Sequence, residues 1–351
     1  MCPSVTWGVM SVRPVPVPLI DPFARRVQDL RISITDRCNF RCAYCMPEEG
    51  MQWLAREELL SYEELARVAR VCVERYSFGA IRITGGEPLV RAHVVRLIEQ
   101  LAPLGVDLAM TTNGVKLPEV AHDLARAGLD RVNISLDSLR RETFFALTRR
   151  DELDRVLAGV DAALEAELVP VKINAVVIRG VNDDEVVDLA AFAREKGVGM
   201  RFIEFMPLDA DGAWSHDKVV PAREILDRID AAFPLRDQPV PGSGHVQPAE
   251  RFEYADGHGD VGVIASVTEP FCDNCDRVRI TAEGKFRTCL FAIDEFDLRS
   301  VLRSGRGLDA PDLDERLAAE IARAVGTKWA GHRIGQVDFV RPGRSMSQIG
   351  G

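Results

Sequence analysis

Residues 30–47 read LRISITDRCNFRCAYCMP, and this stretch decides how the rest of the chain is interpreted. The apolar segment Leu30–Thr35 predicts a β-strand, and the segment after it carries Cys38, Cys42 and Cys45. The spacing Cys-x3-Cys-x2-Cys places three thiolates on one short loop, where they can share a metal centre. Three ligands are one fewer than a closed tetrahedral zinc site or an ordinary four-iron cluster takes. The motif therefore favours a cluster with one open iron, which can bind a small molecule.

A second motif supports this interpretation. Residues 80–84, AIRIT, predict another strand, which leads into Gly85-Gly86-Glu87-Pro88, a loop whose glycines let another molecule approach the backbone closely. A zinc knuckle or a structural cluster without redox chemistry is the alternative for the cysteine motif taken alone, because short cysteine motifs are degenerate. A glycine loop at the end of a strand, roughly 40 residues downstream, makes both alternatives less favoured.

The fold class follows from the alternation of short apolar runs with segments of helical periodicity, which is typical of βα units on a parallel sheet. Six such units are fewer than the eight of a closed barrel, so we predict an α/β fold, an incomplete (β/α)6 TIM-type barrel with a C-terminal iron–sulfur extension. Polar residues at the carboxyl ends of the strands are then expected at one common mouth. The predicted strands are 30–35, 80–84, 106–112, 131–136, 169–177 and 199–205, and the predicted helices are 61–76, 90–101, 118–127, 151–165, 183–195 and 221–232.

The 351 residues are predicted to form three parts. Residues 1–25 are rich in proline and lack the apolar core of a signal peptide, so we interpret them as a disordered arm. Residues 26–233 form the partial barrel, and residues 234–351 form a C-terminal region that ends in two glycines. Within that region we predict a strand over 261–267, a hairpin over 277–290 and helices over 297–304 and 311–325.

The composition excludes several classes of partner. With 44 basic and 54 acidic residues, the chain has a formal net charge of −10, whereas a general nucleic-acid surface needs a basic footprint. No run approaches the roughly 18 apolar residues of a membrane span. Six of the eight cysteines fall in two tight groups, which does not suggest a disulfide framework. We therefore expect a cytoplasmic protein, in a reducing compartment, without nucleic-acid or membrane partners.

Cys272, Cys275 and Cys289 form the second group of cysteines, with the spacing Cys-x2-Cys-x13-Cys. One interpretation is a zinc site completed by a histidine such as His258 or His332, because Cys-x2-Cys pairs are common in zinc sites. The other is a second iron–sulfur cluster with an open iron, which faces the first cluster across the barrel mouth. Two open clusters would then flank one cavity.

The motifs together resemble one family. Seven segments carry the resemblance: DRCNFRCAYCMP over 36–47, TGGEPL over 84–89, TTNG over 111–114, SLD over 135–137, FIEFMP over 202–207, FCDNCDRVR over 271–279 with Cys289, and the final Gly350-Gly351. In this order they resemble the GTP 3′,8-cyclase family of radical S-adenosylmethionine enzymes, from about Arg26 to Gly351. The chain departs from the family pattern at Asp276, where asparagine is usual, and over Lys328–His332, where the family has Lys-Pro-x-x-His.

The resemblance implies roles for individual residues. Cys38, Cys42 and Cys45 would hold a four-iron cluster that binds S-adenosylmethionine, and Cys272, Cys275 and Cys289 would hold a second four-iron cluster that takes the guanine base. The S-adenosylmethionine contacts would be Tyr44, Gly86, Ser135 and Met206. The GTP contacts would be Arg31, Arg82, Thr111, Lys172, Arg277 and Arg279. Arg277, Arg279, Gly350 and Gly351 would also act in catalysis, the two glycines by entering the crowded site.

The implied activity is the first step of molybdenum cofactor biosynthesis. A 5′-deoxyadenosyl radical takes hydrogen from C3′ of GTP, and the ribose radical attacks C8 to form (8S)-3′,8-cyclo-7,8-dihydroguanosine 5′-triphosphate. The resemblance also implies cyclic pyranopterin monophosphate synthase as the downstream enzyme and a one-electron donor that the sequence does not identify, and it allows a homodimer. Two other functions compete with this one: a peptide-modifying maturase, whose auxiliary region usually carries more cysteines, and an electron carrier, which would not need the glycine loop or the barrel.

Overall fold

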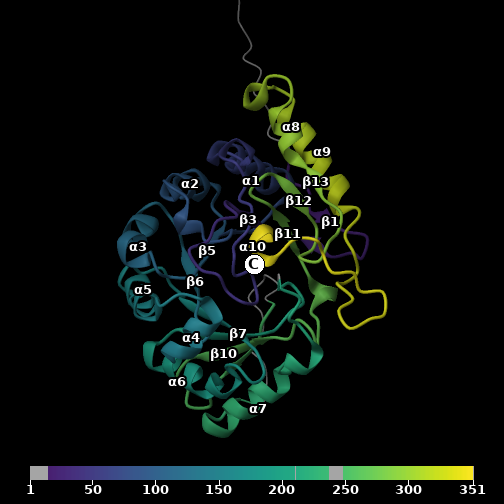
Figure 1. Ribbon diagram of the computed structural model, residues 1–351. Coiled ribbons are helices and arrows are strands. Elements are labelled where there is room, and N and C mark those ends of the chain that lie inside the picture. Colours follow the sequence, from purple (N-terminus) through teal and green to yellow (C-terminus); the bar gives the residue numbers. More distant parts are fainter. Residues whose placement is uncertain (1–14, 210, 237–247, 351) are drawn as a thin grey trace, which may run out of the picture.

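The computed structural model describes residues 15–209, 211–236 and 248–350 (Figure 1). The helices are α1 (Tyr62–Tyr76), α2 (Val94–Leu101), α3 (Leu117–Arg126), α4 (Arg141–Thr148), α5 (Leu153–Glu165), α6 (Val186–Lys196), α7 (Ala222–Ala232), α8 (Leu298–Arg303), α9 (Leu313–Val325) and α10 (Met346–Ile349). The strands are β1 (Leu19–Ile20), β2 (Arg26–Val27), β3 (Asp29–Ser33), β4 (Ala80–Thr84), β5 (Asp107–Thr112), β6 (Arg131–Ser135), β7 (Lys172–Val177), β8 (Gly199–Glu204), β9 (Glu250–Glu253), β10 (Asp260–Ile264), β11 (Arg277–Ile280), β12 (Lys285–Arg287) and β13 (Phe296–Asp297). Within the described ranges, no helix has the length and apolar character needed to cross a membrane.

Eleven strands form one sheet, in the order β13-β12-β11-β3-β4-β5-β6-β7-β8-β10-β9. Strands β3 to β8 follow one another in chain order and are all parallel, as expected of six βα units. The C-terminal region adds a parallel strand to each edge of this unit, β10 beside β8 and β11 beside β3. The predicted α/β class and partial barrel are confirmed. The predicted boundary after residue 233 separates segments that share one sheet.

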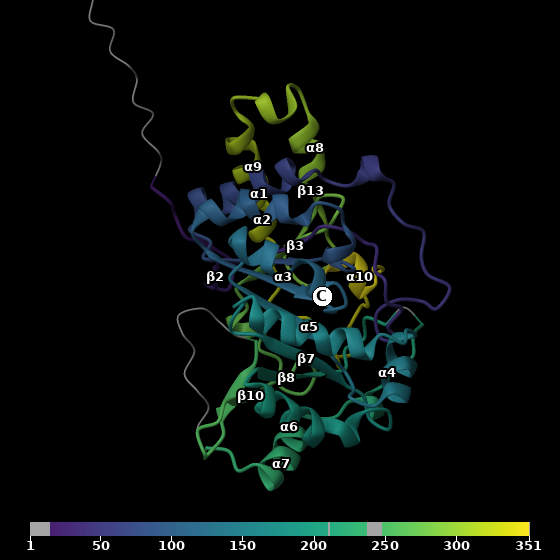
Figure 2. The ribbon, with the colours of Figure 1, turned by 90° about the vertical axis from the view of Figure 1, so that its left-hand side faces the viewer.

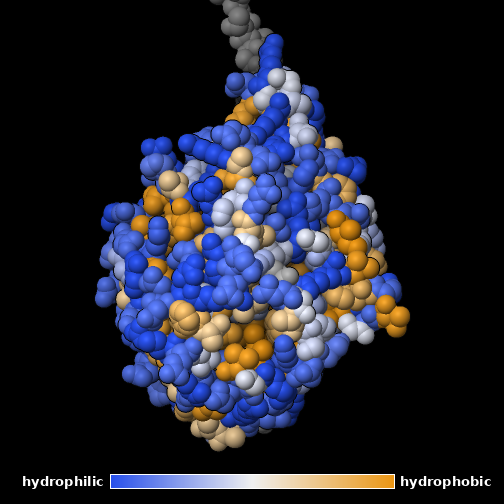
Figure 3. Space-filling view, in the orientation of Figure 1, coloured by the Kyte–Doolittle hydropathy of each residue, from blue (hydrophilic) through white to orange (hydrophobic). Residues whose placement is uncertain are grey.

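The helices form a layer outside the strands. In Figure 1, α1, α2, α3, α5, α6 and α7 lie in an arc around the sheet, and α10 lies near the centre of the arc. Helix α1 begins where predicted, because Ser61 and Glu64 form a capping box in which Ser61 N donates to Glu64 Oε2 at 2.7 Å. Fully buried residues such as Ile32, Ile83 and Leu97 fill the space between the sheet and the helices. The face in Figure 3 is mainly hydrophilic, with scattered hydrophobic patches.

The two ends of the parallel strands face opposite sides of the molecule. Gly350, which follows α10, packs against Ser33 and Thr84, the last residues of β3 and β4, so α10 marks the carboxyl ends. Strand β2 is separated by one residue from the start of β3 and marks the amino ends. Figure 2 shows β2 and α10 on opposite sides of the molecule.

The prediction of a disordered arm over 1–25 is wrong for its last residues. Strand β1 pairs antiparallel with β2, and Val17 N donates to the carbonyl oxygen of Arg75 at 2.9 Å. Asp21 and Arg25 are both buried and form an ion pair, with 2.5 Å between Oδ2 and Nε. The bond to Arg75 and the bonds of Arg25 to the carbonyl oxygens of Cys272 and Ala330 join this segment to distant parts of the chain, so the local composition does not reveal them. Residues 1–14 lie outside the described residues.

The remaining differences between the predicted and the observed elements are smaller, and they concern elements that depend on tertiary contacts. Helix α4, strand β9 and the single-turn helix α10 are absent from the prediction. The predicted hairpin over 277–290 is the antiparallel pair β11 and β12, the strand predicted over 261–267 is β10, and the two C-terminal helices are α8 and α9.

Candidate active site

One cavity of about 640 Å³ lies inside the barrel. Side chains from β3 to β8, the loops at both ends of these strands, and the C-terminal region line it. Sixteen predicted site residues line this cavity: Arg31, Cys38, Cys42, Tyr44, Cys45, Arg82, Gly86, Thr111, Ser135, Lys172, Met206, Cys272, Cys275, Arg277, Arg279 and Cys289. The structure thus brings together residues that are up to 258 positions apart, from Arg31 to Cys289.

The first triad, Cys38, Cys42 and Cys45, lies on the loop after β3, at the carboxyl ends of the strands. The loop is shaped by its own backbone, since Cys45 N donates to the carbonyl oxygen of Cys42 at 2.9 Å. Phe40 N donates to Cys38 Sγ at 3.3 Å. Hydrogen bonds of this kind to cysteine sulfur help set the potential of an iron–sulfur cluster.

The glycine loop after β4 packs against the first cysteine loop. A Cβ atom on Gly86 would lie 2.3 Å from the carbonyl oxygen of Arg37, and one on Gly85 would lie 2.6 Å from that of Thr35. Neither position therefore accepts a side chain. Gly86 N donates to the carbonyl oxygen of Thr35 at 2.7 Å, and Glu87 N to that of Arg37 at 2.8 Å. The chain itself makes the close approach that these two glycines allow, and Gly86 also borders the cavity.

The carboxylate of Glu87 connects this loop to the end of β5. It accepts hydrogen bonds from Leu89 N at 2.9 Å, Thr112 Oγ1 at 2.8 Å and Asn113 N at 2.7 Å. Burial raises the pKa of Glu87 to about 6 in spite of these bonds. Burial and the nearby Glu87 in turn raise the pKa of Cys38 to about 12. The first triad therefore loses its protons when a metal centre binds, rather than beforehand.

Tyr44 links the first triad to the neighbouring strands. Its hydroxyl donates to Asp137 Oδ2 at 2.5 Å, and Val176 N donates to Asp137 Oδ1 at 2.8 Å. Burial raises the pKa of Asp137 to about 6. This bridge fixes the cysteine loop against the carboxyl ends of β6 and β7.

The second triad lies at the other end of the cavity. Cys275 comes two residues before β11, and β11 is parallel to β3, with Arg277 opposite Asp29. Cys272 and Cys275 are therefore at the amino ends of the strands, while the first triad is at the carboxyl ends. The expectation that the two groups face each other across the barrel mouth is wrong. The expectation that both border one cavity is confirmed.

Nearby cations give the second triad a different electrostatic environment. Burial raises the pKa of Cys275, but Arg277 and Lys328 outweigh burial and lower the pKa to about 7. Lys328 Nζ lies 3.9 Å from Cys275 Sγ. Burial and the neighbouring thiols raise the pKa of Cys272, with a backbone hydrogen bond from His332 opposing them.

The zinc interpretations gain no support from the geometry. Across the described residues, no three His, Cys, Asp or Glu side chains are close enough together to hold a single metal ion. Nδ1 of His332 accepts a hydrogen bond from Ile334 N at 3.1 Å, and His258 is an exposed residue paired with Asp256. A four-iron cluster spans its ligands with its own iron and sulfide atoms, so triads of this kind fit a cluster better than one ion.

A row of arginines crosses the sheet between the two triads. Arg279 on β11 is paired in register with Arg31 on β3, and Arg31 with Arg82 on β4. The row continues through Ala109 on β5 to Arg131 on β6. Residues in register on adjacent strands point to the same face, so the guanidinium groups share one wall of the cavity. We call Arg31, Arg82, Arg131 and Arg279 the arginine row.

Several nitrogens of the arginine row have no partner among the residues that the structure describes. Nε of Arg31, Nε and Nη1 of Arg82 and Nη1 of Arg131 are buried without a hydrogen bond to any described residue. Burial, with the neighbouring arginines, lowers the pKa of Arg31 well below its ordinary value, although Asp29 opposes this. Burial and Arg277 lower the pKa of Arg279 to about 10. Adjacent buried cations destabilise the fold, and a polyanion in the cavity would relieve this.

Lys172 adds another cation at the start of β7. Burial, followed by Arg131 and Arg201, lowers the pKa of Lys172 to about 7. Thr111, on β5, contributes a hydroxyl to the same cavity.

The C-terminal segment enters the barrel mouth. Gly350, with φ of 82°, accepts a hydrogen bond at its carbonyl oxygen from Arg279 Nη1. A Cβ atom on Gly350 would lie 2.8 Å from Thr84 Cγ2 and 3.1 Å from Ser33 Cβ. The tight space explains a glycine at this position. Gly351 lies outside the described residues.

Comparison with known proteins identifies the family. Residues 32–193 match the model of the radical SAM superfamily, and residues 198–334 match that of Molybdenum Cofactor Synthesis C. The chain is 48% identical to a GTP 3′,8-cyclase of Paenarthrobacter nicotinovorans, over 95% of this chain and 97% of that protein. It is 49% identical to a GTP 3′,8-cyclase of Streptomyces coelicolor, over 95% of this chain and 96% of that protein. The chain belongs to the GTP 3′,8-cyclase family.

Membership of the GTP 3′,8-cyclase family confirms the predicted enzyme class and implies S-adenosylmethionine and iron–sulfur clusters as cofactors. The fold is also similar to that of SuiB of Streptococcus suis in a structure bound to S-adenosylmethionine. The TM-score is 0.57 at 14% identity, over 86% of this chain and 65% of that chain. This likeness supports the radical SAM fold alone.

Three polar residues of this GTP 3′,8-cyclase family member were not predicted from the sequence. Arg131 and Asn133 line the cavity from β6, and an atom of each is buried without a described partner. The signal was present, because Ser135 was predicted as a site residue and residues 131, 133 and 135 alternate along one face of a strand. Arg201 on β8, buried and paired with Asp260, also lines the cavity and was missed.

Proposed function

We propose that the chain converts GTP into (8S)-3′,8-cyclo-7,8-dihydroguanosine 5′-triphosphate, the first step of molybdenum cofactor biosynthesis. The observation that carries this proposal is one cavity with a thiol triad at each end and the arginine row between them. A nucleoside triphosphate has one part for each of these features: a base for one triad, a ribose that must meet the radical source, and a polyanion for the cations.

Each triad fits an iron–sulfur cluster, because three sulfurs border the cavity, in the first triad from one loop and in the second from the two segments that flank β11 and β12. Cys38, Cys42 and Cys45 would hold the cluster that binds S-adenosylmethionine. When this cluster is bound and reduced, it and S-adenosylmethionine supply the 5′-deoxyadenosyl radical that takes a hydrogen atom from C3′ of GTP. The predicted contacts of that cofactor are Tyr44, Gly86, Ser135 and Met206, and all four border the cavity.

The second triad would place the guanine base near the amino ends of the strands. Arg277 lies beside this triad, with its guanidinium carbon 4.5 Å from the centre of the Phe271 ring. The aromatic ring and the Cys275 thiol fix the orientation of the Arg277 side chain. A guanidinium held in this way can donate to an acceptor atom of a base without first being ordered, which lowers the entropic cost of binding.

The arginine row and Lys172 would bind the triphosphate. Guanidinium groups donate pairs of hydrogen bonds that match phosphate oxygens, and several donors of Arg31, Arg82 and Arg131 are free for this purpose among the described contacts. The global charge of −10 repels anions, so the local arrangement must supply the binding energy. Thr111 would add a hydroxyl donor.

Gly350 would help to close the mouth of the cavity. Because it packs against the ends of β3 and β4, it restricts the entry of water from the side of the first triad. Arg279 donates to Gly350 and also belongs to the arginine row. We expect this link to couple the position of the C-terminal segment to bound nucleotide, which would give Arg279, Gly350 and Gly351 their roles in catalysis.

The partners follow from the reaction. Cyclic pyranopterin monophosphate synthase would consume the product, and a one-electron donor would reduce the first cluster. We place the protein in the cytoplasm, where GTP and reducing conditions are available.

An anaerobic assay tests the proposal. Reconstituted protein with dithionite, S-adenosylmethionine and GTP should form 5′-deoxyadenosine and the cyclic nucleotide in equal amounts, and neither when ATP replaces GTP. Formation of 5′-deoxyadenosine without any dependence on GTP would contradict the cyclase function. Cys45→Ala should abolish both products, whereas Cys72→Ala, a buried cysteine of α1 outside both triads, should keep them.

A further inference from the structure

Two buried cations, Arg25 and Lys328, contact the second triad from outside the cavity. Arg25 is 8% exposed and Lys328 is 3% exposed. A buried charge destabilises a protein unless it is paired or hydrogen-bonded, so the partners of these two side chains indicate what they stabilise.

Lys328 joins the two segments that carry the second triad. Its Nζ atom donates to the carbonyl oxygens of Arg277 at 2.8 Å and Thr288 at 2.5 Å, and it lies 3.9 Å from Cys275 Sγ. Thr288 directly precedes Cys289. Within the described structure Lys328 has no carboxylate partner, and the groups that face it are two carbonyls and a thiol.

Arg25 holds the remaining part of the same site. Its Nη1 atom donates to the carbonyl oxygens of Cys272 and Ala330, both at 2.7 Å, and its Nη2 atom donates to that of Trp329. The ion pair with Asp21 fixes the other side of the guanidinium group. The segment that carries Lys328 is thereby attached to the first cysteine of the triad.

We propose that Arg25 and Lys328 are positioning residues for the second cluster: both hold the cysteine-bearing segments in ligating positions, and the charge of Lys328 also offsets that of the thiolates. This inference rests on the proposed function, in which the second triad holds a cluster. The inference also assigns a role to the segment over 328–332, where the chain departs from the family pattern. It assigns another to Arg25, the last residue of the predicted arm.

The physical reason is the cost of burying an anionic group. Three thiolates and their cluster carry negative charge into a buried site, and adjacent cations with fixed positions reduce the desolvation cost. Hydrogen bonds to the cysteine sulfurs and positive charge nearby also raise the reduction potential of a cluster. The loss of Lys328 should therefore affect both the occupancy and the potential of the second cluster.

The test uses the full chain with Cys38, Cys42 and Cys45 replaced by alanine, so that iron binds only at the second triad. After reconstitution this protein should hold about four iron atoms per chain. Adding Lys328→Met should remove most of that iron and lower the midpoint potential of what remains. Lys328→Arg, which keeps the charge and the donors, should restore both values.

Matched controls separate positioning from general loss of charge. Lys285→Met removes a lysine of β12 that pairs with Asp297 at 2.9 Å, and it should leave the iron content unchanged. Arg25→Met should lower the iron content and alter the electron paramagnetic resonance spectrum, whereas Arg26→Met, at the exposed neighbouring position, should not.

Three results would count against the inference. Full iron content with an unchanged spectrum and potential in Lys328→Met would overturn it. With both triads intact, Lys328→Met should keep the first cluster, and loss of that cluster too would indicate general unfolding and contradict a positioning role. If the background protein with an intact Lys328 binds no iron, the proposed function itself fails, together with the inference that depends on it.

Discussion

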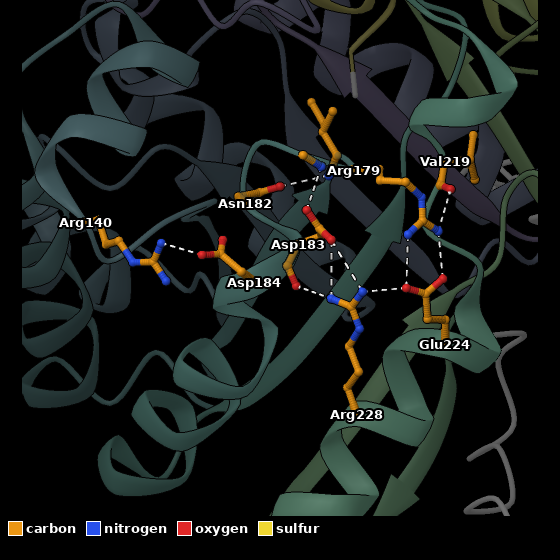
Figure 4. Close-up of polar contacts among 10 residues, drawn as sticks. Arg140, Arg179, Asn182, Asp183, Asp184, Val219, Glu224 and Arg228 are labelled. Atoms are coloured by element: carbon orange, nitrogen blue, oxygen red, sulfur yellow. Dashed lines mark hydrogen bonds and ion pairs between the residues drawn. The ribbon is translucent and has the colours of Figure 1, made fainter.

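The protein uses arginine in two opposite ways, in the arginine row and in an ion-pair network at the surface. Figure 4 shows the network, which joins the segment after β7 to α7. There Arg179 donates to both carboxylate oxygens of Glu224, at 3.1 and 2.7 Å, and Arg228 donates to the carbonyl oxygen of Asp183 at 2.6 Å. Arg140 pairs with Asp184 in the same region. Each of these arginines has a carboxylate partner, whereas Arg31 and Arg82 have buried nitrogens without any partner in the described structure.

This difference indicates that the arginines of the surface network stabilise the fold, whereas those of the arginine row bind a ligand. Exposed pairs stabilise a fold by only about 0–1 kcal/mol each, because water screens them. Unpaired buried guanidinium groups lower stability, so their presence indicates a ligand that completes them. Substitutions in the two regions should therefore have opposite effects on stability, and only those in the arginine row should weaken GTP binding.

The largest effect is expected for Arg82→Met. The substitution keeps the length of the side chain and removes donors that we assign to the triphosphate, so GTP affinity should fall about 100-fold, since hydrogen bonds to charged groups contribute roughly 1.5–3 kcal/mol each. The folded protein should become more stable by about 1 kcal/mol, because the variant loses a buried cation for which the described part of the chain provides no ion-pair partner. Nucleotide titration and thermal unfolding of the same preparation measure both quantities.

A loss of both affinity and stability in Arg82→Met would break the comparison. It would mean that the arginine row supports the fold, as the surface network does. Arg131→Met offers a second test. Arg131 forms an ion pair with Asp107, which the substitution removes, so this variant should gain less stability than Arg82→Met.

The next effect concerns the unsubstituted protein. GTP should stabilise this protein more than guanosine does. A ligand that binds only the folded state at 100 times its dissociation constant raises the free energy of unfolding by about 2.7 kcal/mol. Most of this should require the triphosphate, because the unpaired donors are cations. Thermal unfolding with GTP, GMP and guanosine at equal concentrations measures the difference, and equal stabilisation by all three would place the polyanion elsewhere.

Lys172→Met should have a smaller effect, with a characteristic dependence on pH. The pKa of Lys172 is lowered to about 7, so above pH 7 the free protein has largely lost this proton. A bound triphosphate favours the charged form, and GTP binding at pH 8 should therefore take up a proton, while affinity falls as the pH rises through 7. The substitution should weaken binding roughly 10-fold at pH 6.5.

Calorimetry in two buffers of different ionisation enthalpy measures the proton uptake at pH 8. The same lowered pKa predicts that the free energy of unfolding rises as the pH increases from about 7, since the unfolded chain then binds the proton that the folded chain has released. Lys172→Met should lose both the uptake and the rise. Retention of the proton uptake in this variant would exclude Lys172 as its source.

Local spacing made part of this site predictable from the sequence. The spacing of Cys38, Cys42 and Cys45 is set within one loop, and the six βα units appear as local periodicity, so both were found without knowledge of tertiary contacts. The position of the second triad was not predicted correctly, because it depends on the pairing of β11 with β3, two strands that are separated by more than 200 residues. A parallel partner puts Cys275 at the amino ends of the strands, whereas an antiparallel partner would have put it at the mouth.

Two further misses have the same cause. Arg131 belongs to the arginine row only through the register that aligns β3, β4, β5 and β6. Arg25 has ordinary neighbours in a proline-rich segment, and its importance lies in carbonyl groups more than 240 residues away. Such contacts leave no periodic pattern in a single sequence.

The smallest effect is expected for Arg228→Met, the counterpart of Arg82→Met in the surface network. Arg228 is partly exposed and bonds to Asp183 and Glu224, which Arg179 also contacts. Its removal should lower the free energy of unfolding by at most about 1 kcal/mol, and less at high salt, where exposed pairs are screened. GTP affinity should be unchanged. The same chemical substitution would then lower stability at the surface and raise it in the cavity, and this reversal of sign, rather than either value alone, distinguishes an arginine that holds the fold together from one that awaits a ligand.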